Sequence, residues 1–74
     1  MNPKQELIRA LERRGLWGMV QKAKDGYFSR LGSPYPAPLA QLVKELEALG
    51  HPDLAERARN GDFDHDEPGR AGPR

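Results

Sequence analysis

The sequence predicts an all-α fold, a small bundle of three to four short helices with a proline-rich central connection. The 74-residue chain has no threonine and a single isoleucine, so it offers few of the residues that β-strands favour. Its apolar residues instead recur at intervals of three and four, the spacing of one helix face. Proline and glycine flank these stretches at positions that start and stop helices.

The length and the composition of the C-terminus set the expected domain organisation. The last ten residues, HDEPGRAGPR, include two glycines and two prolines and have no large apolar side chain. We therefore expect one helical domain over residues 1–63 and a disordered acidic, Gly/Pro-rich tail over residues 64–74. A core of about 60 residues is only marginally stable. Because the chain has no cysteine, helix caps, self-association or a larger partner must support it.

The N-terminal half predicts two helices rather than one. The first expected helix covers residues 3–14, with Pro3 in its first turn and Asn2, just before it, as a candidate N-cap. Their apolar stripe consists of Leu7, Ile8 and Leu11. A second stripe consists of Leu16, Val20 and Ala23. It would lie roughly opposite the first stripe in a continuous helix, so we expect a break near Gly15. The alternative is one long helix buried on two sides.

The C-terminal half predicts a helical hairpin. Residues 38–49 start with Pro38 and stop at Gly50, as the terminal preferences require. Their apolar stripe consists of Leu39, Leu42, Val43, Leu46 and Leu49. We expect Leu42 and Leu46 to be fully buried and the other three to be mostly buried. A shorter helix over residues 52–59 should turn three small or apolar residues inward: Leu54, Ala55 and Ala58. The connection is so short that the two helices should pack together.

The central connection is stiff and aromatic. Its prolines, at positions 34, 36 and 38, fix alternate backbone angles and push the residues before them into extended conformations. Such a strut can set the angle between the two helical halves. We expect four large side chains to pack over the join: Tyr27, Phe28, Leu31 and Tyr35. The alternative is that the region from Tyr27 to Tyr35 presents one edge as a preorganised recognition surface.

The stretch over residues 16–64 resembles a group of short uncharacterised proteins encoded by bacteriophages and other mobile elements. The matching residues are Gly26-Tyr27-Phe28, Ser33-Pro34, Pro38, Gln41-Leu42, Glu45-Leu46, Gly50, Leu54-Ala55-Glu56-Arg57 and Gly61-Asp62-Phe63-Asp64. The resemblance implies a small accessory protein that binds a host or phage component. It assigns no activity to any residue.

The residues offer little for catalysis or for metal binding. The run DFDHDE, residues 62–67, begins like a calcium loop but has Glu67 at the position where such loops need glycine. His51 precedes a helix, His65 lies in the expected tail, and no cysteine or suitably placed serine could form a nucleophile pair with either. There is no glycine-rich phosphate loop. We therefore expect no enzymatic activity, no metal and no cofactor.

Charge is unevenly distributed along the chain. Residues 1–37 carry seven basic and three acidic side chains, a net charge of +4, whereas residues 38–74 carry five and eight, a net charge of −3. We therefore expect a non-enzymatic protein that binds a larger protein through the basic half, because arginine, tryptophan and tyrosine often anchor interfaces. The candidate partner-binding residues are Arg9, Arg13, Trp17, Lys24, Tyr27, Arg30 and Tyr35. The other partner that we consider is a second copy of the chain.

The alternative is a small nucleic-acid-binding protein that uses the same basic half. The last two expected helices could also form a helix-turn-helix, but the short second helix carries equal numbers of acidic and basic residues. A sequence pI of 8.1 is modest for a phosphate binder. No run approaches the length of a membrane span, and the N-terminus lacks the apolar region of a signal peptide. We expect a soluble, cytoplasmic protein.

Overall fold

The computed structural model describes residues 2–31 and 33–65, and over these residues the fold is all-α. Their secondary structure consists of four helices and no strand: α1 (Pro3–Arg13), α2 (Trp17–Lys24), α3 (Pro38–Ala48) and α4 (Pro52–Arg59). The predicted fold class is confirmed. The expected break in the N-terminal half is also confirmed, because α1 ends before Gly15 and α2 begins after it.

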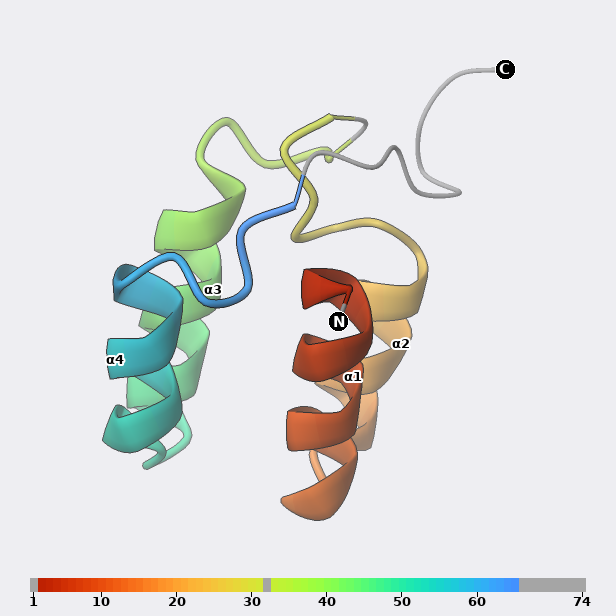
Figure 1. The fold of residues 1–74 in the computed structure, drawn as a ribbon. Helices are drawn as coiled ribbons and strands as arrows, with labels where there is room; N and C mark the ends of the chain where they lie inside the picture. The colour runs from red at the N-terminus through yellow and green to blue at the C-terminus, as the bar shows by residue number, and fades with distance from the viewer. Residues whose placement is uncertain (1, 32, 66–74) are drawn as a thin grey trace.

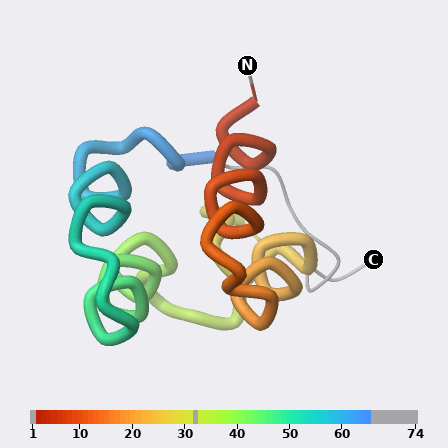
Figure 2. Tube along the Cα trace, turned by 90° about the horizontal axis from the view of Figure 1, so that it is seen from below, coloured from red at the N-terminus to blue at the C-terminus, as the bar shows by residue number. Residues whose placement is uncertain are grey.

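The helices form two antiparallel hairpins that lie side by side (Figure 1). The first hairpin is α1 with α2, and the second is α3 with α4. Viewed along the helices, α1 lies beside α4 and α2 lies beside α3 (Figure 2). The two short loops within the hairpins lie at one end of the bundle, and the connection between α2 and α3 lies at the other (Figure 1).

Local signals at the start and the end of α1 explain its bounds. The side-chain oxygen of Asn2 accepts a hydrogen bond from the backbone N–H of Lys4 at 2.8 Å, which satisfies one of the free donors of the first turn. Gly15 has a φ of +70°, a left-handed conformation that a residue with a Cβ adopts at a cost. This conformation turns the chain back into α2 and makes the first hairpin possible.

The core lies between the hairpins and takes residues from all four helices and from both flanking segments. Phe28, from the central connection, and Phe63, which follows α4, are fully buried. Leu42 and Leu46 are also fully buried, as predicted. The other buried apolar residues are Leu7, Ile8, Leu11, Met19, Val20, Ala23, Leu54, Ala55 and Ala58. The two phenylalanines therefore close the core at positions outside the helices.

The expected burial of the α3 stripe is wrong at its last position. Leu49 is 53% exposed, because it follows the last residue of α3 at the end of the bundle, where the chain turns towards α4. Leu39 and Val43 are half-buried and pack against the edge of the core. A stripe at helical spacing shows which residues share a face, but the neighbouring helices decide how much of that face they cover.

Leu31 also differs from the expectation, because it is 55% exposed instead of packing over the join. The hydroxyl of Ser29 lies within hydrogen-bonding distance of the carbonyl oxygens of Gly26, at 2.8 Å, and of Leu31, and so fixes the turn on both sides of Ser29. Phe28 and Ser29 take the inward positions of this turn, and both are fully buried. Leu31 is left on the outside.

The described chain ends in contact with the central connection. We expected His65 in the tail, but its side chain is buried, and its Nδ1 donates to the carbonyl oxygen of Phe63 at 2.8 Å. The backbone N–H of Arg30 donates to the carbonyl oxygen of His65 at 2.8 Å. The guanidinium of Arg30 donates to the carboxylate of Asp64 at 3.1 and 2.5 Å, and this hydrogen bonding lowers the pKa of Asp64. The rest of the expected tail, residues 66–74, lies outside the described residues.

Candidate functional site

An apolar groove lies at the end of the bundle where the two hairpin loops meet. Trp17, the first residue of α2, is 63% exposed, and Leu49 faces it from the second hairpin. The groove has a volume of about 390 Å³. It is lined by Gly15, Leu16, Trp17, Gly18, Met19, Lys22 and Leu49. We call it the Trp17 groove. Six of its seven lining residues come from the first hairpin, and Leu49 alone comes from the second.

An ion pair bridges α2 and α3 next to the Trp17 groove. The ammonium of Lys22 lies 3.2 Å from each carboxylate oxygen of Glu45. The side-chain amide of Gln41 donates to the same carboxylate at 2.8 Å, so Glu45 is held from both sides. Burial lowers the pKa of Lys22, but its contacts with Glu45 and with the hydroxyl of Tyr35 outweigh burial and raise that pKa overall. Lys22 is therefore a fixed positive charge at the rim of the groove.

The aromatic residues of the central connection pack on one another at the opposite end of α2. Tyr35 stacks on the buried ring of Phe28 at 6.2 Å between centroids, and it meets Tyr27 edge-on at 5.8 Å. The hydroxyl of Ser33 donates to the carbonyl oxygen of Tyr27 and accepts from the backbone N–H of Tyr35. Both tyrosines are half-buried, so each has one side on the core and one side in solvent.

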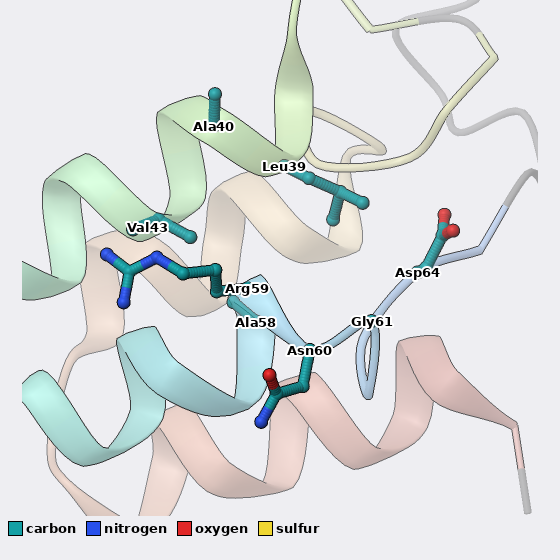
Figure 3. Close-up of a pocket in the computed structure, with 8 residues that line it drawn as sticks. All are labelled: Leu39, Ala40, Val43, Ala58, Arg59, Asn60, Gly61 and Asp64. Carbon is teal, nitrogen blue, oxygen red and sulfur yellow. The ribbon is translucent and has the colours of Figure 1, made fainter.

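A second groove, of about 480 Å³, lies between α3 and the end of α4 (Figure 3). Leu39 and Val43 line it from α3, and Ala58 lines it from α4. The charged side chains at its edge already have partners within the chain. Arg59 pairs with Glu47 at 2.6 Å and with Glu56 at 3.3 Å, and Asp64 pairs with Arg30. The apolar part of this groove consists of Leu39, Ala40, Val43 and Ala58.

The arginines of α1 lie on another side of the bundle, beside α4. Arg9, Arg13 and Arg57 line a small notch of about 200 Å³ together with Glu6 and Ala10. Arg57 is oriented by three contacts: 3.5 Å to Glu6, 3.1 Å to Asp62 and 4.8 Å to the ring centroid of Phe63. The Trp17 groove is lined instead by the α1–α2 loop, by α2 and by Leu49, and it shares no residue with this notch.

The seven candidate residues from the sequence do not form one surface. Trp17 lies in its groove, and Arg9 and Arg13 lie at the notch beside α4. Lys24 is exposed in the last turn of α2. Tyr27, Arg30 and Tyr35 belong to the central connection, at the far end of α2 from Trp17. The length of α2, eight residues, separates the two ends by about 12 Å.

Leu49 and the Lys22–Glu45 pair were not among the residues predicted from the sequence to form a site. A signal for Leu49 is present in its position. Trp17 follows the helix stop at Gly15 by two residues, and Leu49 directly precedes the stop at Gly50. When two helical hairpins pack side by side with their loops at the same end, the helix ends at Gly15 and Gly50 are neighbours. Large apolar residues next to these glycines then lie close together.

Within residues 2–31 and 33–65, no group of three or more His, Asp or Glu side chains is placed to hold a metal ion. No helix in the same part of the chain is long and apolar enough to cross a membrane. No family model, no curated protein and no solved structure matches this chain.

Proposed function

We propose that this protein is a small non-enzymatic binding module that docks on a larger protein through the Trp17 groove. One observation carries the proposal. Among the described residues, the large apolar side chains that are exposed are Trp17, Leu31 and Leu49, and two of these three line the same groove. Contiguous exposed apolar surface is unfavourable in water and marks interaction sites in small soluble proteins.

The chemistry of the groove suits a protein partner. Tryptophan is the residue most enriched at interface hot spots, because it buries a large area and its indole N–H can still donate a hydrogen bond. The fixed charge of Lys22, which lines the groove and is held by Glu45, can position a partner protein. A small accessory role of the kind implied by the resemblance over residues 16–64 fits such a module.

Affinity capture from cell extract with three matched baits tests the proposal. The baits are the wild type, Trp17→Ser and Leu31→Ser, since Leu31 is a similarly exposed apolar residue outside the groove. A protein captured by the wild type and by Leu31→Ser, but not by Trp17→Ser, supports the groove. The purified pair should then bind at least about tenfold more weakly with Trp17→Ser. Equal capture by all three baits would contradict the proposal, and selective loss with Leu31→Ser would favour the central connection.

A further inference from the structure

The two sides of the Trp17 groove carry complementary groups at matching heights along the bundle. Because α2 and α3 are antiparallel, Trp17 at the start of α2 and Leu49 after the end of α3 lie at one level. About one turn further along, Lys22 and Glu45 lie at a second shared level, as their 3.2 Å ion pair shows. Each level therefore has one group on α2 and a complementary group on α3.

We propose that the Trp17 groove pairs two copies of this chain in a two-fold symmetric dimer, with the axis parallel to α2 and α3. This inference rests on the proposed function in taking the groove to be a protein-binding surface, and it names one occupant. Rotation about such an axis lays α2 of each copy on α3 of the other. Trp17 then meets the partner copy's Leu49, and Lys22 meets the partner copy's Glu45.

The charges of the two helices favour this arrangement over its alternative. On the face that α2 and α3 share, α2 presents Lys22 and α3 presents Glu45, whereas Glu47 pairs with Arg59 of α4 on another face. A two-fold axis perpendicular to the helices would lay α2 on α2 and bring like charges together. The parallel axis instead brings Lys22 of each copy to Glu45 of the other, and the symmetry repeats this favourable contact.

The size of the surface sets the expected strength of the dimer. Helices of eight and eleven residues are about 12 and 16 Å long, and two helices side by side are about 20 Å wide, so this face covers about 300 Å² per copy. Stable interfaces bury about 800 Å² per partner. The dimer should therefore be weak and dependent on concentration, so that a larger partner can replace the second copy.

Sedimentation velocity over about three decades of concentration, from micromolar to millimolar, tests for the dimer. The wild type should shift from monomer to dimer, and emission from Trp17, the single tryptophan, should move to shorter wavelength as the dimer forms. Leu49→Ser should weaken association at least about tenfold, whereas Leu31→Ser should change it less than about twofold. Both replaced residues are exposed, and a helical circular dichroism spectrum confirms that each variant folds.

Cross-linking tests the geometry, because the chain has no cysteine of its own. Trp17→Cys and Leu49→Cys variants, mixed and oxidised, should cross-link at least about fivefold faster than either variant alone, since position 17 faces position 49 of the other copy. Equal rates would overturn the parallel axis. Monomers at every concentration would overturn the dimer, while the capture experiment with Trp17→Ser would still decide whether the groove binds another protein.

Discussion

Arg14 is the C-cap residue of α1, and its guanidinium donates two hydrogen bonds, at 3.2 and 2.5 Å, to the carboxylate of Asp53 in the first turn of α4. The ring Nδ1 of His51 lies 3.2 Å from the same guanidinium. This contact joins the two hairpins at the end of the bundle that carries the Trp17 groove. The hydrogen bond from Arg14 is the main cause that lowers the pKa of Asp53 to about 2.

The first prediction concerns acid. A carboxylate whose pKa is lower in the folded state stabilises the fold above its unfolded value of 3.8, and this contribution disappears as the pH falls towards 2. Arg14→Ala should therefore raise the pKa of Asp53 towards 3.8. The variant should then lose less stability than the wild type as the pH falls over this range, because Asp53 no longer contributes to the loss. NMR titration of the Asp53 side chain measures the shift. An unchanged pKa in Arg14→Ala would contradict the assigned cause.

The second prediction compares two leucines of the same sequence stripe. Leu46→Ala removes a fully buried side chain and should lower the free energy of unfolding by about 2–5 kcal/mol. Leu49→Ala removes one that is 53% exposed and should change it by about 0.5 kcal/mol or less. Urea denaturation of the two variants measures both values. Equal losses would show that Leu49 is packed in solution.

The third prediction compares two glycines three residues apart. A Cβ on either residue meets no atom within 4 Å, so the backbone alone decides the effect. Gly15→Ala forces a side chain into a left-handed conformation and should cost about 1–2 kcal/mol. Gly18→Ala lies within α2 and should stabilise the protein by about 0.5–1 kcal/mol. Thermal unfolding should thus give melting temperatures that shift in opposite directions, and shifts of the same sign would refute this interpretation.

The fourth prediction concerns the central connection. Tyr35→Ala removes the ring that stacks on Phe28 and should destabilise the fold by about 1–3 kcal/mol. Tyr35→Phe keeps the ring and loses only the hydroxyl near Lys22, so it should cost about 1 kcal/mol or less. If Tyr35→Ala leaves the melting temperature unchanged but weakens partner capture, the connection is itself a docking surface.

The fifth prediction concerns nucleic acid, the alternative partner. Arg14 and Lys22 already pair with carboxylates, which reduces the positive potential available to phosphates. We expect duplex DNA or RNA to bind with a Kd weaker than about 1 µM near physiological salt. Fluorescence anisotropy measures the affinity, with Arg13→Ala as the matched variant. Tighter binding with a steep salt dependence that Arg13→Ala reduces would favour the nucleic-acid function instead.

Features that depend on local chemistry could be predicted from the sequence. The cap at Asn2, the break at Gly15 and the burial of Leu42 and Leu46 each follow from a few neighbouring residues. The exposure of Leu31 could not be predicted in this way, because it depends on how one turn orients consecutive side chains.

The candidate site depends on contacts between residues far apart in the chain. The pair Lys22–Glu45 joins residues 23 positions apart, and Leu49 reaches the Trp17 groove only because the hairpins pack side by side. Helical periodicity indicates the inward face of each helix, but it does not indicate which hairpin lies beside which. Trp17 could therefore be proposed as a binding residue, whereas the residue opposite it could not.

The walls of the Trp17 groove come from different hairpins, which makes occupancy of the groove and folding thermodynamically linked. A molecule that contacts both Trp17 and Leu49 binds only while the hairpins are associated, so it stabilises the folded state by mass action. At a concentration one hundred times its Kd, such a molecule adds about 2.7 kcal/mol to the free energy of unfolding. For a domain of this size that is a large fraction of the total, so the lifetime of the protein in the cell should depend on whether its groove is occupied.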